Sequence, residues 1–376
     1  MDFVEKLAGA LYGQAIGDAM GAPVEGWQPE GIAARFDSVR AFLPPTHRGD
    51  PATGKGAGRI TDDTLMSEAL MRAYNKSHDH LDAYGYARFM IPEIAQTKVW
   101  VPEYQQEMPL LNRLWWPEKY PWLRLTVANA EPRSAGIGNC VNCGAAMWMF
   151  PVGAANAGDP EGAYQEATAL SLAHNESFAV EAAGVMAAAC AATFGADATL
   201  DQVCQAAAQS GRDGTGLAVK AVLAAVDPAA SLKEFIARAR AAVLPYVAAG
   251  EHVADDAQAQ ARPASNRARP SRTASIEEVP IALGVLRYGA GEFNKTLHAG
   301  VFYGRDCDSI AGMAGALFGA LYGLRALPED LRSASDQANR RDWSRIASEF
   351  ARTVQAILAK DTRRLAHRKA ALAARQ

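Results

Sequence analysis

Gly304-Arg305-Asp306-Cys307-Asp308-Ser309 leads directly into an apolar segment, Ile310 to Leu324. Two carboxylates at positions i and i+2, with a hydroxyl beside the second, point to the same side of an extended chain. Together they offer the oxygen ligands that a hard cation prefers. A second acidic cluster, Thr61-Asp62-Asp63-Thr64, lies near the other end of the chain, with Glu25 upstream of it. Because adjacent acids repel unless a positive charge lies between them, we expect the fold to gather these segments around one or two divalent metals.

Two rows of glycine lie at helical spacing near opposite ends of the chain, each among apolar residues that also follow the helical period. A glycine row allows a neighbouring backbone to approach closely. We therefore predict two core helices that cross tightly, although small residues that only fill a crowded interior fit the same pattern. The rows are Gly9, Gly13, Gly17 and Gly21, and Gly312, Gly315, Gly319 and Gly323.

Helical periodicity also dominates the rest of the chain, and the alternation of β-branched and polar residues that is typical of strands is nearly absent. The fold class predicted from the sequence is therefore all-α. The segments with the clearest helical period are 64–76, Gly162–His174, Ala179–Phe194, Leu200–Ser210, Gly216–Val226, Leu232–Val243 and 342–358.

The domain organisation predicted from these patterns is one all-α catalytic domain over residues 1–330, followed by a C-terminal helical extension, 331–376, with a basic tail. An irregular insertion at about 100–125 contains four of the seven tryptophans. It could stack on a base, cover a site or simply pack onto the body. A second insertion, about 250–275, is poor in large apolar residues, so we expect a mobile surface loop.

Composition limits the classes of function. The chain is 49% hydrophobic with a net charge of −3, which argues against a dedicated nucleic-acid or membrane-surface protein. The N-terminus lacks the basic and apolar regions of a signal peptide, and the longest apolar segment is shorter than the ~20 residues of a membrane span. Five cysteines, including the pair Cys140 and Cys143, fit reduced thiols better than disulfides. We expect a cytoplasmic protein.

The acidic clusters contain carboxylates and hydroxyls but no histidine, a ligand set that favours Mg²⁺ or Mn²⁺ over zinc. An EF-hand that starts at Asp306 would need a Gly at its sixth position and a Glu at its twelfth, whereas Ala311 and Leu317 stand there. Glu25 and the four aspartates together provide more carboxylates than one Mg²⁺ usually takes. Two metals about 3.5–4 Å apart are the simplest arrangement.

Three segments in order carry a resemblance to a known family. Gly17-Asp18-Ala19-Met20-Gly21 with Glu25, then Thr61-Asp62-Asp63-Thr64, then Asp306-Cys307-Asp308-Ser309, resemble the three signatures of the ADP-ribosylglycohydrolase family. Between them, Gly144-Ala145-Ala146-Met147 is similar to another family segment. The resemblance covers residues 1–325. It implies an all-α orthogonal helical bundle with two Mg²⁺ ions, with Mn²⁺ as the alternative, in a dinuclear metal cleft.

The resemblance also implies roles for particular residues. Glu25 and one aspartate of the pair 62 and 63 would handle the attacking water, so the catalytic residues expected are Glu25, Asp62 and Asp63. Trp148 stands where the family usually has Arg, and His174 falls where the family often has His. The implied metal ligands are Thr61, Asp62, Asp63, Asp306, Asp308 and Ser309. The implied substrate-binding residues are Ser134, Gly136, Gly138, Asn139, Trp148 and His174.

The function implied by this resemblance is a Mg²⁺-dependent hydrolase that cleaves the glycosidic bond at C1″ of an ADP-ribosyl group. One alternative keeps the chemistry but acts on a small ribosylated metabolite or nucleoside. Another is a catalytically silent, crystallin-like binding protein. The expected partner is an ADP-ribosylated protein or a small ribosylated molecule, with neither nucleic acid nor membrane, and the oligomeric state is left open.

Overall fold

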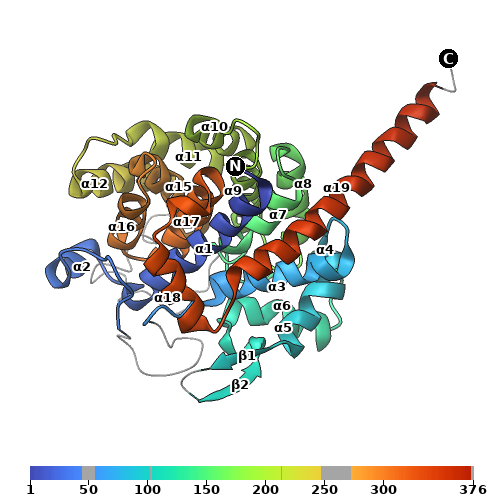
Figure 1. Ribbon diagram of the computed structural model, residues 1–376, viewed down its shortest axis with the longest axis horizontal. Helices are drawn as coiled ribbons and strands as arrows, with labels where there is room; N and C mark the ends of the chain where they lie inside the picture. The colour runs from blue at the N-terminus through green and yellow to red at the C-terminus, as the bar shows by residue number, and fades with distance from the viewer. Residues whose placement is uncertain (45–55, 102–103, 213, 247–271, 374–376) are drawn as a thin grey trace.

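The computed structural model describes residues 1–44, 56–101, 104–212, 214–246 and 272–373, and packed helices make up most of these (Figure 1). The predicted all-α class is confirmed. No helix among the described residues has both the length and the apolar character needed to cross a membrane. Most of the predicted insertion at 250–275 lies outside the described residues.

Two helices from opposite ends of the chain form the centre of the fold, α1 (Phe3–Gly21) and α17 (Cys307–Tyr322). Their glycine rows face each other with backbone against backbone. A Cβ atom added to Gly13 would lie 2.0 Å from the carbonyl oxygen of Gly315, and one added to Gly9 would lie 2.2 Å from that of Gly319. The predicted tight crossing is therefore confirmed, and it brings the end of α1 to the start of α17.

Further helices surround this central pair. Helices α15 and α16 pack against α17, and the Ala-rich helix α9 is buried along most of its length. The predicted bounds of the Ala-rich region agree with the structure to within a few residues, because capping boxes at Thr199 and Ser231 begin two of its helices at the expected positions. The helices that surround the central pair are α7 (Phe150–Ala155), α8 (Pro160–Ser171), α9 (Phe178–Thr193), α10 (Leu200–Ser210), α11 (Gly214–Ala225), α12 (Leu232–Val243), α15 (Arg272–Gly289) and α16 (Phe293–Tyr303).

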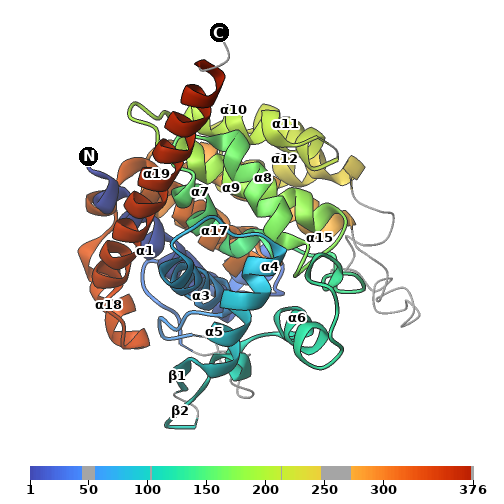
Figure 2. The same cartoon turned by 90° about the vertical axis from the view of Figure 1, so that its right-hand side faces the viewer.

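The insertion predicted to be irregular at 100–125 has regular structure. Strands β1 (Lys98–Val101) and β2 (Gln106–Pro109) form an antiparallel hairpin, and helix α6 (Trp116–Thr126) follows (Figure 2). A two-stranded hairpin is only marginally stable by itself. Here Arg340 covers the ring of Trp100 at 3.9 Å from its centroid. Pro117 is compatible with α6 because a proline in the first turn of a helix removes no helical hydrogen bond.

Along the chain, helices α2, α3, α4 and α5 come between α1 and the hairpin, and α18 and α19 follow α17. Helix α19 extends well beyond the predicted segment 342–358, and its last turns project from the body (Figures 1 and 2). The bounds are α2 (Pro29–Arg35), α3 (Asp62–Ser77), α4 (Ala83–Gly85), α5 (Ile91–Gln96), α18 (Glu329–Asn339) and α19 (Trp343–Ala373).

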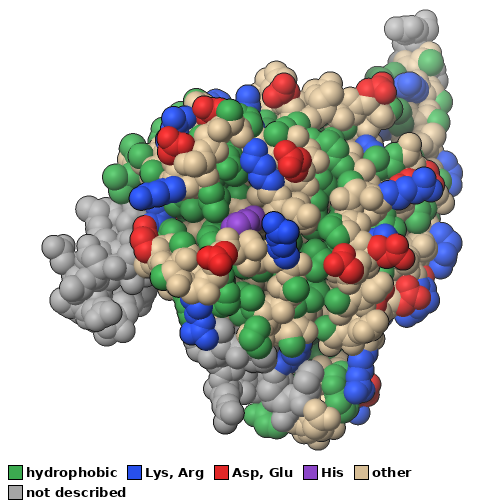
Figure 3. All heavy atoms as spheres, turned by 60° about the vertical axis from the view of Figure 1, so that its left-hand side comes forward, with side chains coloured by type: hydrophobic (Ala, Val, Ile, Leu, Met, Phe, Trp, Pro, Cys, Tyr) green, Lys and Arg blue, Asp and Glu red, His purple; other side chains and the backbone are tan. Residues whose placement is uncertain are grey.

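Charges on the surface are mixed. Figure 3 shows one face on which basic and acidic side chains are interspersed and neither sign forms a continuous area. This distribution agrees with the small net charge of −3. The acidic clusters that the sequence predicts line an interior pocket instead.

A buried glutamate links helix α19 to the body. Glu166 accepts hydrogen bonds from the hydroxyl of Tyr74 and from the backbone N–H of Leu81, both at 2.7 Å. It also contacts Nδ1 of His80, whose Nε2 lies 2.9 Å from Asp361 in α19. The two carboxylates favour the protonated imidazole, mainly through the Glu166 hydrogen bond, and raise the pKa of His80 to about 9.

This arrangement predicts a pH-dependent contribution to stability. Because the folded pKa lies above the unfolded value of about 6.5, the contribution of His80 is complete below about pH 6.5 and is lost as the pH rises through about 9. We expect His80→Gln to lower the free energy of unfolding by about 1–2 kcal/mol at pH 6, allowing for solvent screening. Chemical denaturation at pH 6 and pH 10 should show this difference shrinking. An equal difference at both values would contradict the assignment.

Candidate metal centre and active site

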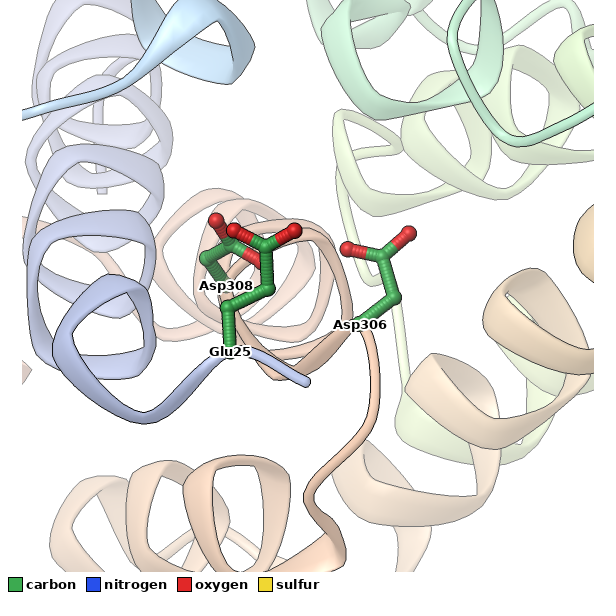
Figure 4. Close-up of side chains that lie close together, drawn as sticks. All are labelled: Glu25, Asp306 and Asp308. Atoms are coloured by element: carbon green, nitrogen blue, oxygen red, sulfur yellow. The ribbon is translucent and has the colours of Figure 1, made fainter. Parts of the chain in front are cut away.

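Three carboxylates meet at the crossing of α1 and α17. Glu25 follows the short 3-10 turn that extends α1, Asp306 is the N-cap of α17 and Asp308 lies in its first turn. Each offers one oxygen, and these oxygens all lie within 4.8 Å of one another. Figure 4 shows the three carboxylates converging. The close approach of the helices makes this possible, since a Cβ on Gly21 would lie 2.6 Å from the Cα of Asp308.

The second acidic segment begins helix α3 and faces the same pocket. Thr61 is the N-cap, and its hydroxyl donates to Oδ2 of Asp63 at 3.0 Å. The other carboxylate oxygen of Asp63 is buried and has no hydrogen-bond partner among the described residues. The pocket has a volume of about 190 Å³. It is lined by Glu25, Asp62, Asp63, Trp115, Glu118, Asn142, Cys143, Met147, Asp306, Asp308 and Ser309.

An aspartate to which the sequence analysis gave no role holds the α3 segment in place. Asp18 in α1 is fully buried and accepts hydrogen bonds from the backbone N–H of Thr61 at 3.0 Å and from the hydroxyl of Thr64 at 2.6 Å. Burial, followed by the nearby charge of Asp308, raises the pKa of Asp18 to about 7. Its signals in the sequence are an acid within an otherwise apolar, glycine-rich helix and its place in the segment Gly17–Gly21 that carries the family resemblance.

Crowding of the carboxylates in the interior shapes the electrostatics of the pocket. Burial, and then repulsion from Asp308, raises the pKa of Asp306 to about 7. Burial, and then repulsion from Asp18, raises the pKa of Asp63 well above its ordinary value. A divalent cation would offset this repulsion, and carboxylate and hydroxyl oxygens are the donors that Mg²⁺ prefers. The residues present therefore fit a hard divalent metal, with the unpartnered oxygen of Asp63 as one available ligand.

Glu118 is a site residue that the sequence analysis missed. It lies in the first turn of α6, is 1% exposed and lines the pocket. Burial, and then the charge of Asp62, raises the pKa of Glu118 well above its ordinary value. The sequence offers no clear signal, because an isolated Glu between Pro117 and Pro121 resembles an ordinary solvated residue. Cys143 was also missed as a site residue, and its thiol donates to Asp306 at 3.0 Å.

The glycine-rich segment predicted to bind substrate does not line the pocket. Asn139 is buried, and its amide donates to the carbonyl oxygens of Pro117 and His174 at 2.9 and 2.7 Å. Gly136 packs against the backbone at Asn175. Ser134 and Gly138 belong to the same turn and likewise lie outside the lining of the pocket. In this structure the segment supports α6 and the loop after α8.

Two other residues of the predicted substrate-binding set, Trp148 and His174, lie in the core. Trp148 and His174 are each fully buried, and their ring centroids are 5.3 Å apart in an edge-to-face arrangement. The 3-10 turn Ala146–Trp148 directs the indole toward His174 and Tyr86 and away from the pocket. Burial lowers the pKa of His174 to about 4, so the ring is neutral at pH 7. Neither side chain lines the pocket.

Comparison with known proteins decides the family. The sequence profile described as ADP-ribosylglycohydrolase matches residues 1–364. The chain belongs to the ADP-ribosylglycohydrolase family. The family and the fold together support an ADP-ribosylglycohydrolase-like hydrolase. Membership of the family implies the general class of substrate, an ADP-ribosylated molecule.

The chain is also similar to individual proteins. The chain is 25% identical over 356 residues to the "Uncharacterized protein YegU" of Escherichia coli (strain K12), which covers 93% of this chain and 97% of that protein. It is 38% identical over 71 residues to an "Uncharacterized protein" of Archaeoglobus fulgidus, which covers 18% of this chain and 22% of that one. A solved "ADP-ribosylglycohydrolase-related protein complex" matches with a TM-score of 0.64 at 17% identity, covering 94% and 99% of the two chains. This last similarity concerns the fold alone.

Proposed function

We propose that the protein is a Mg²⁺-dependent hydrolase that cleaves the glycosidic bond at C1″ of an ADP-ribosyl group. The observation that carries the proposal is the convergence of carboxylates from four separate segments on one pocket. They are Glu25, Asp62, Asp63, Glu118, Asp306 and Asp308.

Two Mg²⁺ ions, or Mn²⁺ ions, would be held by acids and hydroxyls from the starts of α3 and α17. When bound, the metals supply positive charge that orients the ribose hydroxyls and activates water. The residues that would hold them are Thr61, Asp62, Asp63, Asp306, Asp308 and Ser309.

The protein's own side chains have further tasks. Cleavage of a glycosidic bond passes through a state with oxocarbenium character, which nearby carboxylates stabilise by their negative charge. Glu25 offers an oxygen within 4.8 Å of oxygens of Asp306 and Asp308, and it is suited to accept a proton from the attacking water. Asp62 or Asp63 would orient that water, and Asp18 would hold the segment on which both depend.

A second candidate, supported by the size and charge of the pocket, keeps the chemistry and changes the substrate to a small ribosylated metabolite or nucleoside. The volume of about 190 Å³ is small beside the ~300–1,000 Å³ of typical ligand pockets. No lysine or arginine is among the described residues that line the pocket, which disfavours a substrate with a diphosphate.

A turnover assay separates these candidates. We expect release of the leaving group in the presence of Mg²⁺, loss of release with excess EDTA and recovery when Mg²⁺ is restored. ADP-ribosyl-arginine, ADP-ribosyl-serine and free nucleosides should be compared in parallel. Turnover of nucleosides alone would favour the second candidate. Binding of Mg²⁺ without turnover of any substrate would indicate a silent, crystallin-like protein and would overturn the proposed hydrolase.

A further inference from the structure

An exposed aromatic residue forms part of the pocket wall. Trp115 is the N-cap of α6 and is 54% exposed, although it lines the acidic pocket. Its backbone N–H lies 3.4 Å from Oδ2 of Asp62, a weak contact that links the start of α6 to the α3 segment. A large apolar ring that stays exposed beside a cluster of carboxylates is available to a ligand.

A buried polar atom lies on the same helix turn. Glu118 follows Trp115 by three residues, a spacing that places two side chains on one side of a helix. The Glu118 side chain is 1% exposed and lines the pocket, yet its Oε2 atom has no hydrogen-bond partner among the described residues. A buried oxygen without a partner is costly unless a ligand or water satisfies it. Trp115 and Glu118 therefore offer a flat apolar surface with a hydrogen-bonding group next to it.

We propose that Trp115 and Glu118 form the subsite for the leaving group, and that this group is planar and attached through nitrogen. This inference rests on the proposed glycosidic hydrolysis and names the class of bond that is cleaved. The leaving group stacks on the indole of Trp115, and a nitrogen of the leaving group hydrogen-bonds to Oε2 of Glu118. A cationic ring is favoured over a neutral one, because the indole face attracts cations and the surrounding carboxylates are negative.

The next residue provides a matched control. Trp116 is 53% exposed, nearly the same as Trp115, but it does not line the pocket. Its ring lies edge-on to Tyr120 with the centroids 5.9 Å apart. A general effect of removing an exposed tryptophan from α6 should therefore appear equally in both variants. An effect on the leaving group should appear only in the Trp115 variant.

The kinetic test compares two substrates that share an ADP-ribosyl group, one linked to the planar guanidino nitrogen of arginine and one to the aliphatic oxygen of serine. Loss of base–aromatic stacking typically corresponds to a change of about 5- to 150-fold. We expect Trp115→Ala to raise KM for the planar substrate by about tenfold or more and to leave the serine substrate nearly unchanged. Trp115→Phe should restore most of the affinity, and Trp116→Ala should behave as wild type. An equal change for both substrates would overturn the subsite.

A binding test does not depend on turnover. 1-Methylnicotinamide is a flat aromatic cation that the enzyme cannot hydrolyse, and calorimetry measures its affinity directly. We expect about tenfold weaker binding to Trp115→Ala, weaker binding to Glu118→Gln and unchanged binding to Trp116→Ala. Absent binding to wild type, or equal binding to wild type and Trp115→Ala, would refute the subsite. If the expected pattern occurs but no ribosyl substrate is cleaved, the subsite stands and the proposed hydrolysis is wrong.

Discussion

Asp306→Asn is expected to abolish hydrolysis and to remove the stabilising effect of Mg²⁺ at the same time. The substitution keeps the size of the side chain and removes one negative charge from a cluster whose oxygens lie within 4.8 Å of one another. Even residues that only support metal ligands cost about 10- to 100-fold when they are replaced. We therefore expect kcat/KM to fall by at least about 100-fold. The same result is expected for Asp62→Asn.

Thermal unfolding distinguishes this explanation from simple damage to the fold. Without metal, burial and the charge of Asp308 oppose ionisation of Asp306, whose pKa is raised to about 7. Removing that charge should therefore raise the unfolding temperature of the metal-free variant above that of the metal-free wild type at pH 8. Added Mg²⁺ should stabilise the wild type but not the variant. Asp330→Asn, an exposed site in α18, serves as the control. Full turnover in Asp306→Asn, or an undiminished response to Mg²⁺, would contradict the proposed metal centre.

Gly315→Ala is expected to destabilise the fold strongly despite adding only a methyl group. The new Cβ would lie 2.1 Å from the carbonyl oxygen of Gly13, so the backbones of α1 and α17 must separate. Overpacking usually costs about 1–3 kcal/mol. Because no flexible side chain is present to yield, we expect a loss of about 3 kcal/mol or more in the free energy of unfolding, measured by chemical denaturation.

The same helix provides the control for this prediction. A Cβ added to Gly312 would meet its nearest neighbour at 3.6 Å, an ordinary contact with Asp18. Gly312→Ala should therefore be neutral or stabilising by up to about 1 kcal/mol, because alanine favours helix over glycine. If the two variants had similar stability, the close crossing would not be what holds α1 and α17 together.

The spacing of small and acidic residues made the centre of the fold predictable. Glycines at every third or fourth position in two distant segments indicated the crossing of α1 and α17. The paired acids then marked the helix starts that this crossing brings together. Both signals are local in the sequence, and each has one dominant physical cause: close approach of backbones in one case and charge repulsion in the other. The paired acids Asp62 and Asp63, and Asp306 and Asp308, were found in the sequence for this reason.

The remaining site residues depend on tertiary packing that no local pattern shows. Trp148 was predicted to bind substrate because it directly follows Met147 in the sequence. The 3-10 turn directs the two side chains to different places, and of the two only Met147 lines the pocket. Glu118 is brought to the pocket by the hairpin and α6. The prolines in this segment pointed instead to irregular structure.

The central pairing of α1 with α17 also has a consequence for how the protein folds in the cell. Roughly three hundred residues separate the two helices, so the N-terminal one leaves the ribosome long before its partner is made. Contacts of such wide separation form slowly, and an apolar helix that waits for its partner is a target for chaperones and for aggregation. A nascent chain of this protein can acquire its acidic pocket only after synthesis has passed Ser309, the last residue that lines it.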